Sequence, residues 1–291
     1  MSGVSAVFLT ALSFLGCFFS AMRFGENILN DAVGLLLAFG VTVLIVLSLM
    51  RLKNRFSALS EHKTAKAAVS AIVFLVILFA LLENVAIFSS YASKNILHEA
   101  EILSVAFLLL GVSVFAALSG ERVLLKTGLL LFPITVLFVA VIFAFSVPYM
   151  DVKYILPYKK IELYGIMAAF LRYILKFLPF ALISTVGIGK FGVKNIVKGL
   201  VLGITIGAFC LVNTVAVFGA EVAAVTQYPY TAAVGVAAVG DIFSRMDGFL
   251  YAVYFFACYT FSAMSIYSLG RLLKIFVAVI KDVNLLFCDN S

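Results

Sequence analysis

Three ionisable residues lie within long apolar stretches of this 291-residue chain: Glu83, Arg172 and Lys176. A charged side chain is costly in hydrocarbon unless it faces a cavity or another charge. Arg172 and Lys176 are four residues apart, so they share one face of a helix. The depths of Glu83 and Arg172 in a bilayer differ by only about 7 Å. We expect Glu83 to pair with Arg172 or Lys176 in the interior of a helix bundle. Two roles stay open for the pair, which either orients the helices or handles a substrate or a proton.

The stretches that hold these residues are typical of a membrane protein. Hydrophobic residues make up 64% of the chain and charged residues 12%. Eight apolar stretches are near the roughly 20 residues that a bilayer core requires, and lipid offers no hydrogen-bond partner to an unpaired backbone, so each must be a helix. The predicted spans are Val4–Met22, Ala32–Met50, Ala67–Phe88, Ile102–Leu118, Gly128–Val147, Leu163–Val186, Gly199–Phe218 and Gly248–Gly270. We predict an all-α, polytopic transmembrane bundle over residues 1–274 and a short cytoplasmic or interfacial tail over 275–291.

Basic residues fall mainly on one side of the predicted bundle. Loops 51–66, 119–127 and 187–198, with the segment after Gly270, hold thirteen Lys and Arg residues, against six in the alternate loops. The positive-inside rule therefore places both termini in the cytoplasm. No stretch has the alternating pattern of an outer-membrane barrel, so a bacterial inner membrane, of the cell or the spore, is favoured. The net charge of +7 is explained by loops that face anionic lipid, and no nucleic-acid partner is expected.

The first and sixth stretches contain small and helix-breaking residues. Gly16 and Ser20 lie in the first stretch, and Pro179 lies in the sixth, ahead of Ser184 and Thr185. Proline deletes an internal helix hydrogen bond, and nearby small polar residues can satisfy the freed carbonyl groups. Two interpretations stay open here. A helix broken at Pro179 would expose backbone groups to a ligand, whereas a packed kink would not.

Residues that could hold a metal or perform catalysis do not converge in the sequence. The four cysteines include no CxxC pair, and His62 and His98 fall in loops on opposite sides, so neither a metal nor a cofactor is expected. No Ser/His/Asp set or carboxylate pair converges within the spans. We therefore name no catalytic residue and do not expect an enzyme.

Three further patterns predict local structure. Gly199, Gly203 and Gly207 form two overlapping GxxxG motifs, which allow a neighbouring helix to approach closely. The apolar segment 220–246 is interrupted by turn residues and predicts a pair of short helices rather than a span. Tyrosines around the fifth loop are expected to anchor the bundle at the membrane interface, or else to form a lid over an extracellular entrance. They are Tyr149, Tyr154, Tyr158 and Tyr164.

Several short motifs follow one another along the chain: Phe132-Pro133, Pro148, Asp151, Leu156-Pro157, Phe177–Ile183, Tyr228-Pro229 and Gly240–Asp247. Their order resembles the permease subunit of bacterial spore germinant receptors. The resemblance implies the fold of the amino acid/polyamine/organocation transporters, with ten helices in two inverted halves and with helices one and six interrupted around a small-molecule site. Members of this family act with a lipoprotein and a second membrane subunit to sense germinants, commonly amino acids. Relative to that pattern we expect the bundle to be incomplete, without the last two helices of the second half.

With this resemblance, the candidate ligand contacts come from helices one, three and six. They are Gly16, Ser20, Glu83, Phe177, Ser184 and Thr185, and Arg172 or Lys176 could hold a carboxylate. We expect a germinant-receptor subunit that senses an amino acid and signals germination with partner subunits. The alternatives are a secondary amino-acid transporter and a structural membrane subunit without a ligand of its own.

Overall fold

The computed structural model describes residues 2–22, 25, 27–56, 63–97, 100–154, 160–187, 192–226, 228–236 and 247–288. Within these ranges the regular secondary structure is helical and contains no strand, which confirms the predicted all-α fold. The longer helices are α1 (Ser2–Ala21), α2 (Ile28–Phe56), α3 (Lys63–Asn95), α4 (Ile102–Leu118), α5 (Glu121–Ser146), α6 (Leu163–Gly187), α7 (Val193–Phe218) and α10 (Asp247–Cys288). The shorter ones are the 3₁₀ turns η1 (Val147–Tyr149) and η2 (Val152–Tyr154) and the helices α8 (Ala220–Val225) and α9 (Pro229–Val236).

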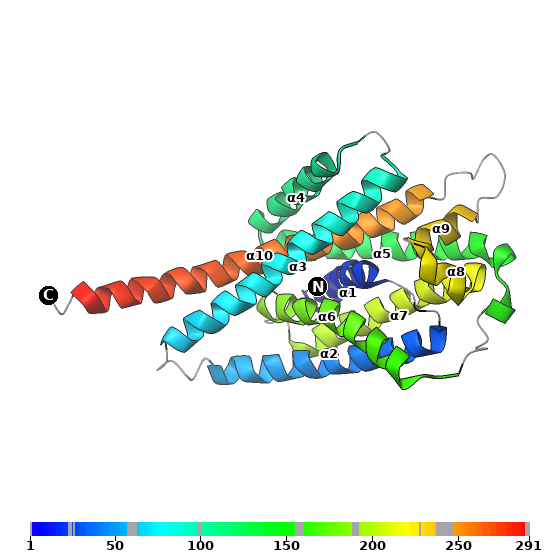
Figure 1. Ribbon diagram of the computed structural model, residues 1–291. Coiled ribbons are helices and arrows are strands. Elements are labelled where there is room, and N and C mark those ends of the chain that lie inside the picture. Colours follow the sequence, from blue (N-terminus) through cyan, green and yellow to red (C-terminus); the bar gives the residue numbers. More distant parts are fainter. Residues whose placement is uncertain are drawn as a thin grey trace.

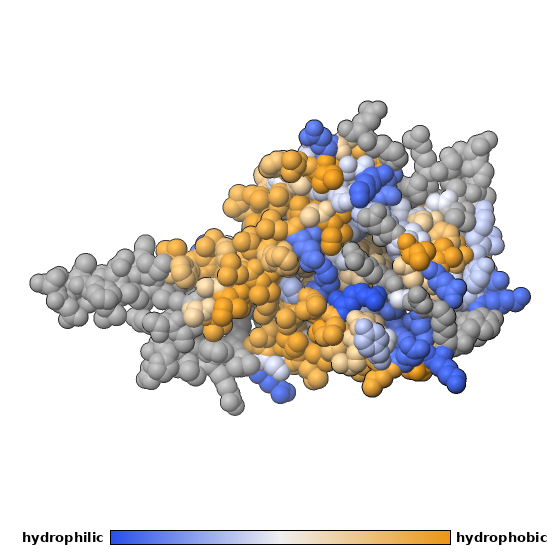
Figure 2. Space-filling model, viewed as in Figure 1, coloured by the Kyte–Doolittle hydropathy of each residue, from blue (hydrophilic) through white to orange (hydrophobic). Residues whose placement is uncertain are grey.

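Seven of these helices are long and apolar enough to cross a membrane, and they coincide with seven of the predicted spans. The remaining one, α4, is an apolar helix of 17 residues, which is the lower end of the length that can cross a bilayer. Large apolar side chains point away from the bundle, among them Phe79, Phe107 and Phe115, each more than 70% exposed. Figure 2 shows such side chains gathered over the middle of the helices. A surface of this kind is expected in lipid and not in water.

The first helix lies at the centre of the bundle (Figure 1). It is buried along 78% of its apolar span, compared with 33% for α2, α3 and α6. It contacts α5, α6, α7 and α10, and its Phe14 and Phe18 side chains are fully buried. Phe14 packs against Phe177 of α6, with ring centroids 4.8 Å apart. The fold is therefore organised around a central helix, as hydrophobicity on all its faces requires.

Gly199, Gly203 and Gly207 form a glycine stripe on α7, which packs against α1. Its three glycines face Thr10, Phe14 and Phe18, which are spaced by one helical turn. A Cβ atom added to these glycines would lie 2.5, 2.8 and 2.9 Å from those three side chains, in that order. Atoms cannot approach so closely, so only glycine permits this separation between the helices. The predicted role of the overlapping GxxxG motifs is confirmed.

Neither α1 nor α6 is interrupted, which corrects the expectation drawn from the resemblance. The first helix continues past Gly16, and α6 continues past Pro179, the predicted helix break. At Gly16 the close approach of the Ala257 backbone and of Phe261 leaves no space for an unwound segment. Near Pro179 the Cys17 thiol of α1 donates a hydrogen bond to the Lys176 carbonyl oxygen at 2.7 Å. Contacts from neighbouring helices thus stabilise a continuous helix at both positions. Of the two interpretations at Pro179, the packed helix is observed and the exposed break is not.

Segment 220–246 begins with two short helices, α8 and α9, as predicted, and its remainder lies outside the described residues. The final helix, α10, continues without a break past Lys274, the predicted end of the transmembrane domain, to Cys288. Around the fifth loop the side chains of Tyr149, Tyr154 and Tyr164 are 39%, 48% and 85% exposed. This exposure suits an interface anchor, while Tyr158 lies outside the described residues.

Candidate functional site

Two basic side chains of α6 connect it to two different helices. The Lys176 ammonium donates a hydrogen bond to Oε1 of Glu83 in α3. The Arg172 guanidinium lies 3.6 Å from Oδ1 of Asp31 in α2. The predicted pairing of Glu83 is confirmed, with Lys176 and not Arg172 as its partner.

The Glu83–Lys176 pair does not lie in the interior of the bundle, which corrects its predicted location. The Glu83 side chain is 37% exposed and the Lys176 side chain 23%. The pair lies where α3 and α6 face each other, and in Figure 2 hydrophilic side chains interrupt the apolar surface between these two helices. The two helices are in contact, and both residues lie on partly exposed helix faces, so their long side chains can reach each other.

Asp31 is a functional candidate that the sequence analysis missed. Its side chain is only 3% exposed, and it accepts a hydrogen bond from the backbone N–H of Gly25 in addition to facing Arg172. The second predicted span begins at Ala32, which leaves Asp31 in the loop before it. The signal that could have identified it is the run Asn30-Asp31 directly before an apolar stretch, because a cation within another membrane span, such as Arg172, requires an anion at a similar depth.

Asp31 and Arg172 line a cavity of about 340 Å³ where α2 and α6 begin. We refer to it as the polar cavity; its lining residues are Gly25, Asn27, Asn30, Asp31, Lys160, Glu162, Gly165, Ala168 and Arg172. Asn27 Nδ2 donates to the Lys160 carbonyl oxygen at 2.9 Å, and the Glu162 backbone N–H donates to Asn30 Oδ1 at 3.2 Å. These bonds hold the segment before α6 against the start of α2. The residues that line the polar cavity thus include two acids, Asp31 and Glu162, and two bases, Lys160 and Arg172.

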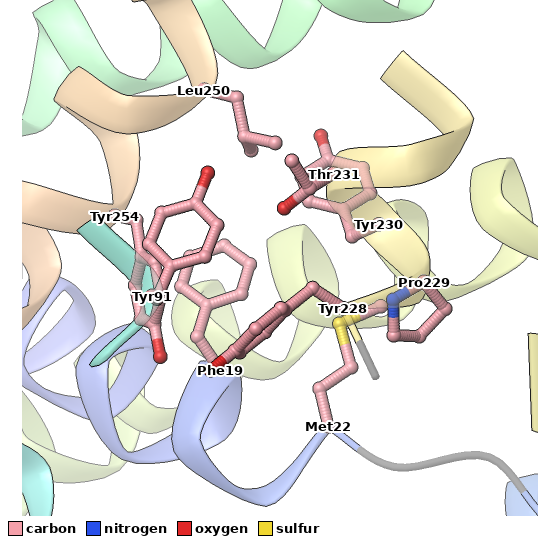
Figure 3. A pocket seen from close by; sticks show the side chains of 9 residues that line it. All are labelled: Phe19, Met22, Tyr91, Tyr228, Pro229, Tyr230, Thr231, Leu250 and Tyr254. Carbon is pink, nitrogen blue, oxygen red and sulfur yellow. The ribbon is translucent and has the colours of Figure 1, made fainter. Parts of the chain in front are cut away.

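A second, smaller cavity of about 40 Å³ lies between α1, α3, α9 and α10. We refer to it as the aromatic cavity (Figure 3); its lining residues are Phe19, Met22, Tyr91, Tyr228, Pro229, Tyr230, Thr231, Leu250 and Tyr254. The two cavities share no lining residue. The sequence analysis named none of these aromatic residues as a ligand contact.

Two of the predicted contacts, Gly16 and Ser20, lie in α1. The Gly16 carbonyl oxygen accepts a hydrogen bond from Asn84 Nδ2 of α3 at 3.3 Å, so the residue next to Glu83 contacts α1. Ser20 donates to the Cys17 carbonyl oxygen within its own helix. Neither Gly16 nor Ser20 lines either cavity.

The three other predicted contacts belong to the core of the bundle. Phe177 is fully buried among aromatic rings. Ser184 and Thr185 are buried and donate to the Ala181 and Leu182 carbonyl oxygens of α6. Serine and threonine hydroxyl groups in membrane helices commonly donate their hydrogen bond to a backbone carbonyl oxygen of the preceding turn. The structure therefore groups Arg172, Lys176 and Glu83 around α6 and separates them from Ser184 and Thr185.

A search for metal sites, limited to the part of the chain that the structure describes, finds no group of three His, Cys, Asp or Glu residues that could bind a metal.

A model of the spore germination protein family matches residues 33–285, which extend from α2 almost to the end of α10. The chain belongs to the spore germination permease family. The match includes Glu83, Arg172 and Lys176. A comparison with curated proteins finds no match. Family membership and seven apolar helices together identify a multi-pass, transporter-like membrane protein related to spore germination.

Proposed function

We propose that this permease is the membrane subunit of a germinant receptor that senses an amino acid and signals germination with partner subunits, including a lipoprotein. The family match supports a role in germination. We place the protein in the inner membrane of the cell or spore with both termini in the cytoplasm, which the distribution of basic residues supports. In this orientation α2 and α6 begin at the outer surface, so the polar cavity is open to a germinant from outside.

The observation that carries this proposal is the mixed charge of the polar cavity. A free amino acid has one carboxylate and one ammonium group. The Arg172 guanidinium offers two parallel N–H donors to a carboxylate, while Asp31 and Glu162 offer oxygens to an ammonium group. The cavity volume of about 340 Å³ lies near the lower end of the usual range for small-molecule sites.

Helix α6 is the element that would transmit binding. Arg172 connects it to α2, and one turn further Lys176 connects it to α3. A ligand carboxylate that attracts Arg172 competes with Asp31 and weakens the α2–α6 connection. Ligand binding then shifts the population toward the arrangement in which α6 has moved, provided that this arrangement binds the ligand more tightly.

A second candidate function, a structural subunit without its own ligand, is favoured by the continuity of α1 and α6. Neither helix is unwound into a segment that would expose its backbone groups to a ligand, and Phe177, Ser184 and Thr185 are buried. The secondary-transporter alternative has no comparable support among the described residues.

The proposal is tested by the thermal stabilisation of the purified chain in lipid nanodiscs by each of the standard L-amino acids. Each is compared with the matching amine, which lacks the carboxylate. We expect at least one amino acid to raise the melting temperature and its amine to have no effect, since a ligand stabilises the state that it binds. Arg172→Gln should weaken binding by about 10- to 100-fold, the value of a charged hydrogen-bonded contact.

The control is Arg122→Gln, which removes an exposed arginine of α5 and should leave binding unchanged. Each variant is compared with its own ligand-free state, and Arg172→Lys, which keeps the charge but loses the paired donors, serves if Arg172→Gln fails to fold. The proposal is wrong if no amino acid stabilises the protein, or if amino acid and amine bind equally well. Binding to sealed right-side-out vesicles, with ligand added outside, checks the orientation.

A further inference from the structure

Two close contacts hold α2 and α6 together along the polar cavity. Near the start of both helices the Asn30 side chain covers Gly165, where an added Cβ atom would collide with Asn30 Nδ2. One turn further along, a Cβ atom added to Gly34 would lie 2.6 Å from the Ala169 Cβ atom and 2.8 Å from the Phe170 backbone nitrogen. Glycine at these two positions therefore allows α2 and α6 to lie side by side at close range (Figure 1).

Ala168 lies between these contacts along α6 and belongs to the wall of the polar cavity. The next residue, Ala169, is fully buried against α2, whereas Ala168 is exposed. Arg172 follows Ala168 by four residues, so the two residues share one face of α6 and their Cβ atoms are about 5–6 Å apart. One helical turn from the guanidinium group, the wall of the cavity is therefore formed by a methyl group.

The charged groups determine which part of an amino acid would face this methyl group. In the proposed complex Arg172 binds the carboxylate of the ligand, and Asp31, whose carboxylate lies 3.6 Å from the guanidinium group, binds the ammonium group. Both ligand groups are bonded to its α carbon, so that carbon is held close to both charges. From there the cavity continues past Ala168 toward Gly165 and Glu162. The side chain of the ligand would therefore extend along α6 and contact Ala168.

The space next to Ala168 cannot be enlarged without a loss of helix packing. A longer ligand side chain would have to push α2 away from α6, and this movement would separate Asn30 from Gly165 and Gly34 from Ala169. Closely packed helices resist such a change because each lost contact costs dispersion energy. The cavity has a volume of about 340 Å³, so the size of the side chain at position 168 affects which ligands fit inside it.

We propose that Ala168 sets the upper limit on the size of the amino-acid side chain that the polar cavity accepts. This inference rests on the proposed function and adds to it a residue that determines specificity. Ala168 selects by size, and its role is separate from that of Arg172, which binds the carboxylate that all amino acids share. In a close-fitting pocket, one methylene group more or less changes binding by about 10- to 200-fold.

The test compares glycine, L-alanine, L-valine and L-leucine as ligands of the purified chain in lipid nanodiscs. The measured quantity is the ligand concentration that gives half of the maximal thermal stabilisation. We expect the affinity to fall by at least about tenfold at one step of this series. Ala168→Val, which enlarges the wall, should move that step to a shorter ligand side chain. Ala168→Gly, which removes the methyl group, should move it to a longer one.

The matched control is Ala86→Val in α3, at an alanine that is also exposed but does not line the polar cavity. It should leave the step in the series where it is in the original chain. Ala168→Gly carries the test alone if Ala168→Val does not fold, because the two variants shift the step in opposite directions.

The results separate this inference from the proposed function. If the amino acids bind but the step is the same in every variant, the size limit at Ala168 is overturned while the amino-acid site stands. The same conclusion follows if a variant of Ala168 weakens all four ligands equally, because Ala168 would then support the cavity without selecting by size. If none of the four ligands and no other amino acid stabilises the original chain, the amino-acid site is wrong and the size limit is overturned with it.

Discussion

At the residue scale, the two cations of α6 have partners in different surroundings. Asp31 is 3% exposed while Arg172 is 29% exposed, so the acid depends on the pair more than the base does. Glu83 and Lys176 are both partly exposed. A carboxylate removed from water needs an opposite charge, whereas a long basic side chain can extend to a polar boundary.

This difference predicts unequal effects for the two halves of the Asp31–Arg172 pair. Arg172→Gln should destabilise the protein by about 3 kcal/mol, because it leaves a buried carboxylate without its cation. Asp31→Asn should cost about 1 kcal/mol, because the guanidinium is partly exposed. The double variant should cost less than the sum of the two single variants. The measurement is unfolding of the purified chain in detergent, and equal costs with full additivity would show that the pair does not interact.

Sequence reasoning found part of this site. It identified Glu83, Arg172 and Lys176 because charges within apolar stretches are rare and need partners. It did not decide which pairs form, because that depends on the rotation of each helix about its axis. It missed Asp31 because the apolar stretch begins one residue later.

At the element scale, the α1–α7 contact shows how a short motif positions a whole helix. The glycine stripe was visible in the sequence, but its partner was not, since GxxxG spacing does not specify which helix approaches. The continuity of α6 shows the opposite case. Pro179 marks a weak point in the helix, yet α6 is continuous there and packs against α1, whose Cys17 thiol donates a hydrogen bond to the Lys176 carbonyl oxygen.

Gly203→Leu tests the close contact. The new side chain would collide with Phe14, already 2.8 Å from the position of an added Cβ, and force α1 and α7 apart. We expect a loss of about 1–3 kcal/mol in stability, the usual cost of overpacking, or failure to accumulate in the membrane. The matched control is Gly111→Leu in α4, where an added Cβ meets nothing within 4 Å. Similar stability losses for both variants would contradict the proposed packing.

At the scale of the whole molecule, hydropathy and loop charge predict the class of protein but not its cavities. Eight apolar stretches and a set of short motifs were enough to predict a helical membrane bundle and its family. The aromatic cavity joins residues 19, 91, 228, 230 and 254, and no spacing along the chain indicates that they meet. Such sites are products of tertiary packing, which a single sequence does not display.

The central claim is that α6 transmits ligand binding in the polar cavity to the rest of the receptor through its ion pairs. It is tested most directly by the germination of spores that carry Glu83→Gln in place of the original chain. Glu83 contacts Lys176 but does not line the polar cavity, so the variant tests transmission rather than ligand contact. The measurement is the fraction of spores that germinate with a mixture of amino acids, together with the amounts of this chain and of its proposed partner subunits in the spore membrane. We predict that the germination response is at least about tenfold weaker, while the proteins are present in the membrane in normal amounts. This factor corresponds to the loss of one charged hydrogen-bonded contact. A response that falls only in proportion to a loss of assembly would contradict the account and indicate a structural subunit.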